Sequence, residues 1–157
     1  MDMLESIAQT EGEIDSLDNI VRAFDYLQKR EMPKTNHSGL ENVIKNVNKI
    51  LGYSGEYAEN ERKAHGYNIY YDEPWKIKYK MENLILDVQN HTIKEEEFAL
   101  RFLKIHPFKD GNGRTLKLVM SHIYNKLYLW ENQKEFVTLL KNDDVKNMKI
   151  YLSNITK

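Results

Sequence analysis

Apolar residues recur with a helical period along most of the chain, which predicts a mainly α protein. From Ser16 one helical face collects Leu17, Ile20, Val21, Phe24 and Leu27, and this helix is expected to end near Met32 and Pro33. A second helix is expected from Ser38 to Gly52. Its inward positions are Leu40, Val43, Ile44, Val47, Ile50 and Leu51.

The second half of the chain continues this pattern. Pro74 suits the first turn of a helix that reaches about Asn90. Thr92 and Glu95 have the spacing of a capping box and open a helix that stops before Pro107. Helical spacing resumes at Leu116, and the tail over 132–155 predicts one or two amphipathic helices.

The stretch from Gly52 to Asp72 interrupts the helical period. It is rich in tyrosine, and residues 66–71 combine a turn signal with residues that favour strands. A short β-hairpin is expected there. An ordinary tyrosine-rich surface turn is the alternative.

Composition limits the class of protein. The 157 residues suit a single domain, with 41% hydrophobic and 30% charged residues. A net charge of −1 gives no electrostatic case for a nucleic-acid partner. No cysteine is present, and no apolar run approaches the ~18 residues of a membrane helix, so we expect a cytoplasmic protein with no membrane partner. A homo-oligomer is not excluded.

One polar loop between two apolar helices carries the candidate chemistry. Residues 106–117 read HPFKDGNGRTLK. Gly111 and Gly113 allow close approach of a ligand, and the N-terminus of the following helix attracts anions. Arg114 offers a fork for phosphate oxygens, with Lys117 one turn further on the same helical face. The loop therefore predicts a phosphate site.

Two other residues complete the candidate site. Asp110 is one carboxylate beside the phosphate loop, which is how Mg²⁺ is commonly held together with substrate phosphates. His106 is a candidate general base, because its ordinary pKa lies near neutrality. The aspartate does not begin an EF-hand, because arginine and threonine occupy the fifth and sixth positions from it. Taken alone, a Gly-Asn-Gly turn or a histidine at a helix end is more often structural, and only their combination with Asp110 and the two cations indicates a site.

Residues 106–117 resemble the Fic signature HPFx[DE]GNGRxxR, and only Lys117 departs from it, in place of the final arginine. The resemblance extends over about Gly39 to Leu129 and implies a Fic-type helical bundle with a β-hairpin flap. The two loop glycines are similar to those of Fic adenylyltransferases, whereas the related Doc kinases have alanine and lysine there. Lysine keeps the charge but loses the bidentate fork.

The resemblance implies transfer of AMP from ATP to a Tyr, Ser or Thr hydroxyl of a target protein. His106 would be the general base, and Asp110 would hold Mg²⁺ as cofactor. The nucleotide-binding residues would be Gly111, Asn112, Gly113, Arg114 and Lys117. The flap, near Ala64–Tyr71, would dock the target as an added strand.

Many Fic proteins carry an inhibitory helix with the motif [ST]xxxE[GN], and Glu11–Gly12 is similar to its end. Ile7 stands where the motif has Ser or Thr, and an exposed acidic helix end is the alternative. The expected organisation is one Fic domain over 1–157, with a candidate inhibitory helix at 1–15, a core at 16–130 and C-terminal helices at 131–157. A different Fic activity, such as transfer of another phosphate-containing group or removal of AMP, stays open, as does a non-catalytic nucleotide-binding module.

Overall fold

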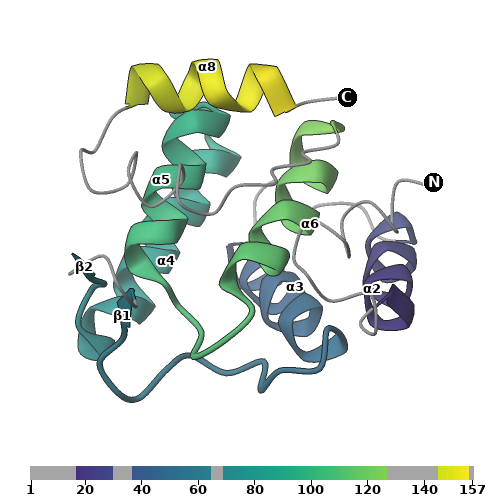
Figure 1. Cartoon of the computed structure of the whole chain (residues 1–157), viewed down its shortest axis with the longest axis horizontal. Helices are drawn as coiled ribbons and strands as arrows, with labels where there is room; N and C mark the ends of the chain where they lie inside the picture. Colours follow the sequence, from purple (N-terminus) through teal and green to yellow (C-terminus); the bar gives the residue numbers. More distant parts are fainter. Residues whose placement is uncertain (1–16, 30–36, 65–68, 127–144, 156–157) are drawn as a thin grey trace.

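The computed structural model describes residues 17–29, 37–64, 69–126 and 145–155. Within these ranges the chain is mainly helical, as the hydrophobic period predicts (Figure 1). The helices are α2 (Leu17–Gln28), α3 (His37–Ile50), α4 (Pro74–Gln89), α5 (Glu95–Ile105), α6 (Asn112–Tyr124) and α8 (Val145–Ile155).

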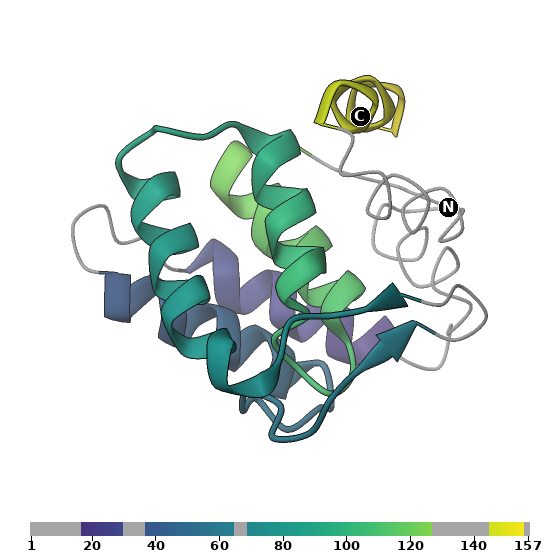
Figure 2. The same ribbon diagram turned by 90° about the vertical axis from the view of Figure 1, so that its left-hand side faces the viewer.

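Two helices organise the packing. α3 contacts α2, α4 and α6, and α5 contacts α4, α6 and α8. Their apolar faces meet in one core whose largest fully buried apolar side chains include Phe98, Phe102 and Phe108. α8 lies at the end of α5 that is remote from the α5–α6 loop, so this loop is on the opposite side of the molecule (Figures 1 and 2).

A short antiparallel hairpin follows α3. Strand β1 (Lys63–Ala64) pairs with β2 (Ile69–Tyr70), with Lys63 opposite Tyr70 and Ala64 opposite Ile69. Figure 2 shows it beside the end of α5 that leads into the α5–α6 loop. The expected mainly α fold with a β-hairpin is confirmed.

The capping box expected at Thr92 and Glu95 is wrong. Lys94 occupies the N-cap position of α5 and makes no side-chain cap. The Thr92 hydroxyl instead donates to the Asp87 carbonyl at the end of α4, at 3.1 Å. Three glutamates in the first turn of α5 favour that helix end by their charge, without a cap.

The ends of the chain are described only in part. α8 confirms a helix within the expected C-terminal segment, whereas Glu11 and the candidate inhibitory helix lie outside the described residues. The single-domain boundaries stay a prediction. None of the helices that the structure describes is long and apolar enough to cross a membrane.

Candidate functional site

The α5–α6 loop is shaped by two left-handed residues. His106, the C-cap of α5, has φ 49° and ψ 63°, and Gly111, the N-cap of α6, has φ 78°. Pro107 excludes continuation of α5, so the chain reverses here and enters α6 at Asn112. The α5–α6 loop, which begins at the C-cap of α5, and the N-terminus of α6 lie at one end of the helical bundle (Figure 1).

Asn112 and Phe108 lock the loop from inside. The Phe108 amide donates to Asn112 Oδ1 at 2.9 Å, and Asn112 Nδ2 donates to the Phe108 carbonyl at 2.7 Å. Phe108 is fully buried, as expected of an apolar anchor, and forms an antiparallel bridge with Tyr57. The Asn112 amide group thus stabilises the turn itself.

Asn48, on α3, ties the loop to the neighbouring helix. Its side chain is fully buried, and its Nδ2 donates to the Asp110 carbonyl at 3.1 Å and to Thr115 Oγ1 at 3.2 Å. Its Oδ1 accepts the Gly55 amide at 3.0 Å. One side chain therefore fixes the backbone at Asp110 against both α3 and the segment that follows it.

The first turn of α6 offers amide donors. No residue in the described ranges accepts a hydrogen bond from the amides of Gly111, Asn112 or Gly113. Helix N-terminal amides without partners, together with the helix dipole, form an anion site. This is the feature that a phosphate group requires.

The Asp110 side chain is exposed beside these amides. The part of the chain described here contains no group of three His, Asp or Glu side chains that could hold a metal ion. A lone carboxylate beside an anion site fits Mg²⁺, which keeps several waters and is commonly bound by one or two carboxylates plus phosphate oxygens. Asp110 is the residue that would hold it.

Tyr53 covers the start of α6. Arg114 Nη1 donates to the Tyr53 hydroxyl at 2.6 Å, and the Arg114 side chain is only 5% exposed. The Tyr53 ring lies so close to Gly111 that a Cβ there would come within 3.0 Å of three ring atoms. Gly111 is therefore required by its positive φ and by this ring, whereas the close approach of a ligand at this glycine stays a prediction.

Lys117 lies one turn after Arg114 in α6, and its side chain is fully buried. It stands among the core residues Leu116 and Leu118 rather than at an open surface. Its nucleotide-binding role stays a prediction. The structure adds that any contribution to a phosphate would come from beneath the loop.

His106 packs against the flap. Its imidazole stacks on the Tyr71 ring with centroids 3.7 Å apart and planes 3° from parallel. The pKa of His106 is lowered to about 4, mainly by burial and further by the positive charge of Arg62, while the hydrogen bond with the Leu103 backbone partly opposes this. Nδ1 is buried and forms no well-aligned hydrogen bond within the described ranges. The ring is thus neutral at pH 7 and able to accept a proton.

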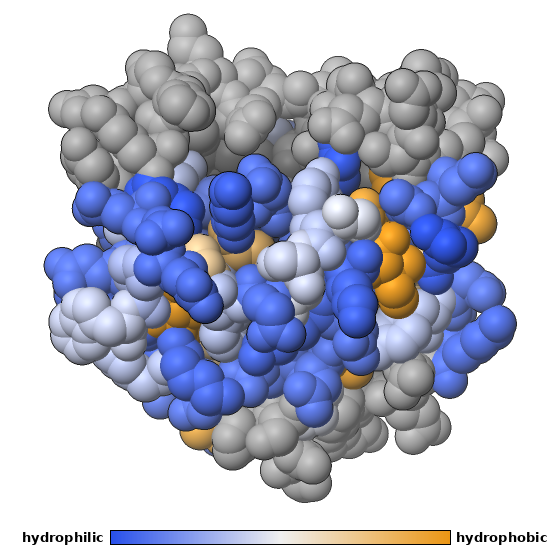
Figure 3. Space-filling view, turned by 90° about the horizontal axis from the view of Figure 1, so that it is seen from below, coloured by the Kyte–Doolittle hydropathy of each residue, from blue (hydrophilic) through white to orange (hydrophobic). Residues whose placement is uncertain are grey.

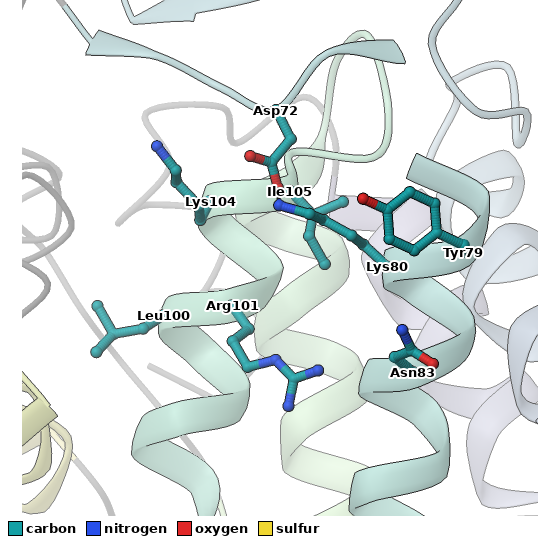
Figure 4. A pocket seen from close by; sticks show the side chains of 8 residues that line it. All are labelled: Asp72, Tyr79, Lys80, Asn83, Leu100, Arg101, Lys104 and Ile105. Atoms are coloured by element: carbon teal, nitrogen blue, oxygen red, sulfur yellow. Dashed lines mark hydrogen bonds and ion pairs between the residues drawn. The ribbon is translucent and has the colours of Figure 1, made fainter. Parts of the chain in front are cut away.

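A separate hollow of about 310 Å³ lies between α4 and α5, below the end of the flap (Figure 4). Lys80 and Arg101 line it and form ion pairs with Asp72 and Asp87, at 2.9 and 2.7 Å. None of the predicted site residues lines it. The face that carries the α5–α6 loop is mostly hydrophilic with separate apolar patches (Figure 3).

The structure brings His106, Asp110 and the first turn of α6 to one loop, with Arg114 and Lys117 beneath it. Sequence reasoning missed Asn48, Tyr53 and Arg62, which hold this loop. Asn48 had a signal, because it is a polar residue on the apolar face of α3, next to Val47. Tyr53 and Arg62 lie in irregular segments, where no periodicity indicates burial.

The sequence model of the Fic/DOC family matches residues 37–124, more than half of the chain. This chain belongs to the Fic/DOC family. The match contains α3, the flap, α4, α5, the α5–α6 loop and α6, which are the elements that build the site.

Solved Fic structures share the fold at low sequence identity. The N-terminal FIC domain of Bep8 from Bartonella sp. 1-1C has a TM-score of 0.70 and 14% identity, over 100% of this chain and 87% of that one. BepC from Bartonella tribocorum, with bound AMPPNP, has a TM-score of 0.69 and 14% identity, over 91% and 85%. A Fic family protein from Desulfovibrio desulfuricans G20 has a TM-score of 0.60 and 15% identity over 99% of this chain, which spans only 53% of its length.

Among curated proteins, the ribonucleoside-diphosphate reductase small chain of Ostreid herpesvirus 1 is 48% identical over 40 residues. This segment is 26% of the present chain and 7% of the viral protein. So short a match carries no argument about activity.

Proposed function

We propose that this Fic protein transfers AMP from ATP to a Tyr, Ser or Thr hydroxyl of a target protein. The observation that carries the proposal is the α5–α6 loop, which combines a neutral imidazole with amides at the start of α6 that have no partner among the described residues. Bound nucleotides in two related folds support it, AMPPNP in BepC and ADP in the Fic domain from Bartonella quintana.

His106 acts as the general base in this proposal. It removes the proton of the target hydroxyl, the oxygen attacks the α-phosphate in line, and pyrophosphate leaves. Its low pKa keeps the ring unprotonated at pH 7, and the negative phosphates of a bound nucleotide would raise that pKa toward the working pH. Bound ATP would thus raise the basicity of the imidazole that deprotonates the target hydroxyl.

The loop binds the nucleotide through positively charged side chains and through backbone amides that point at the phosphates. The amides of Gly111 and Gly113 face the phosphates, Asn112 keeps the turn rigid, and Arg114 with Lys117 supplies positive charge beneath it. Mg²⁺ held by Asp110 would neutralise phosphate charge when it is bound. Preorganised donors of this kind lower the barrier for transfer at phosphorus.

The target is proposed to pair with the flap, since no third strand of the described residues pairs with this hairpin, which lies beside His106. Glu11 is proposed as a brake that pairs with Arg114 and excludes the γ-phosphate. If so, the wild type is weakly active, and Glu11→Gly raises AMP transfer.

The test incubates the Glu11→Gly variant with magnesium, a cell lysate and ATP labelled at the α- or the γ-phosphate. AMP transfer predicts protein-bound label from the α-position only, and its loss in the Glu11→Gly, His106→Ala double variant. Label from the γ-position would indicate phosphate transfer instead. No label from any of the four nucleotides, with wild type or variant, would favour a non-catalytic binding module.

A further inference from the structure

Arg62 lies just before the flap and is buried, with 8% of its surface exposed. Its four hydrogen bonds all go to backbone carbonyl groups. Nε donates to His106 at 3.0 Å, and Nη2 donates to Ile105 at 2.7 Å and to Asp72 at 2.8 Å. Nη1 donates to Asn60 at 3.2 Å.

These carbonyls belong to three segments of the chain. Asn60 precedes the flap, Asp72 follows it, and Ile105 and His106 end α5. Figure 4 shows Asp72 above Ile105, where the flap meets the helix. The last carbonyls of a helix lack intrahelical partners and carry partial negative charge, so a buried guanidinium between them is well placed.

Backbone hydrogen bonds complete the junction. The Tyr71 amide donates to the Arg62 carbonyl at 3.2 Å, and the Asp72 amide donates to the Lys104 carbonyl at 3.1 Å. The imidazole of His106 stacks on Tyr71 within the same junction. His106 has the left-handed conformation that a residue with a Cβ adopts only under constraint, and Arg62 binds its carbonyl.

We propose that Arg62 is a positioning residue that fixes the His106 backbone and the flap in one geometry, so that the base and the docked hydroxyl are aligned. The role rests on the proposed function of His106. Arg62 touches neither nucleotide nor reacting atoms in this account. It acts through the four carbonyls.

The positive charge of Arg62 also acts on the pKa of His106. Burial lowers the pKa of His106 most, and Arg62 adds to this, whereas the Leu103 carbonyl opposes it. Tyr71, which stacks on the imidazole, has its pKa raised by burial and stays neutral at pH 7. Other charged side chains of the neighbouring segments are Glu61, Asp72, which pairs with Lys80, Glu73, Lys104, Lys109 and Asp110.

The experiment compares Arg62→Gln and Arg62→Lys in the full chain. The His106 ring is titrated by NMR without nucleotide or magnesium, and AMP transfer is measured against pH. Arg62→Gln removes the charge and most donors, so the pKa of His106 should rise above about 4 but stay below 6.5, because burial is the larger cause, and the acid limb of the rate should follow. Arg62→Lys keeps the charge, so the pKa should stay low, but one ammonium cannot reach all four carbonyls. Its rate should fall about tenfold or more through misalignment.

Arg101→Gln is the matched control, because it removes an α5 arginine and its 2.7 Å ion pair with Asp87. It should leave the titration of His106 unchanged. The proposal is overturned if Arg62→Gln lowers the melting temperature but leaves the His106 titration and the pH dependence of AMP transfer as in the wild type. It is also overturned if Arg62→Lys retains the wild-type rate, which decides the matter even when Arg62→Gln does not fold. Absence of AMP transfer in both the wild type and Glu11→Gly would refute the proposed function, and the NMR titration would still show whether Arg62 acts on His106.

Discussion

Gly111→Ala tests the contact between the phosphate loop and Tyr53. Gly111 has φ 78°, and an added Cβ would overlap three atoms of the Tyr53 ring. The left-handed conformation costs a residue with a Cβ ~1–2 kcal/mol. The ring must also move and lose its hydrogen bond from Arg114, and a hydrogen bond to a charged group is worth ~1.5–3 kcal/mol. The expected loss of unfolding free energy is therefore about 3 kcal/mol.

A double-mutant cycle separates the two contributions. In a Tyr53→Ala background the ring is absent, so Gly111→Ala should cost only the backbone part, about 1 kcal/mol. Urea unfolding followed by circular dichroism gives the four free energies. Gly113→Ala is the matched control, because Gly113 lies inside α6 without a positive φ and should tolerate alanine. The role given to the Tyr53 ring would be refuted if the free-energy losses of Gly111→Ala and Tyr53→Ala add within ~0.5 kcal/mol in the double variant. It would also be refuted if Gly111→Ala costs no more stability than Gly113→Ala.

Three further predictions concern buried polar groups. Burial raises the pKa of Glu41, but hydrogen bonds from Lys78 and Tyr57 outweigh it and hold this pKa below its ordinary value. Glu41→Gln should lower the free energy of unfolding in urea by about 2 kcal/mol at pH 7. This difference in stability from the wild type should shrink as pH falls through the native pKa of Glu41. A difference in stability that does not change with pH would contradict this. Because burial keeps His106 neutral in the fold, the wild type should lose stability between pH 6.5 and 4, where the unfolded chain binds the extra proton. His106→Phe should lose less stability over that range by thermal unfolding, and equal losses would refute it. Asn48→Leu removes the side-chain hydrogen bonds to Asp110 and Thr115 and leaves the buried Gly55 amide without its acceptor. It should therefore lower the free energy of unfolding by ~1–3 kcal/mol and increase hydrogen exchange at the Gly55 amide. Unchanged exchange at Gly55 would argue against this network.

The helices were predictable because each buries one apolar stripe, and Ile44, Val47 and Leu51 show this along α3. The loop chemistry was predictable because HPFKDGNGR is compact in sequence. The supports of the loop were not, because Asn48, Tyr53 and Arg62 are distant from it in sequence and reach it only through the fold. The capping box predicted at Thr92 was wrong because the Thr92 hydroxyl donates to the Asp87 carbonyl at the end of α4. The sequence spacing of Thr92 and Glu95 gives no sign of this competing acceptor.

The central claim is that the start of α6 binds the phosphates of ATP opposite His106. A titration of the ¹⁵N-labelled protein with ATP and magnesium tests it directly, because each backbone amide reports its own environment. The account predicts that the largest and saturable shifts occur at the amides of Gly111, Asn112 and Gly113, with the ring of His106 following. Shifts confined to the α4–α5 hollow around Arg101, with the loop amides unmoved, would contradict it.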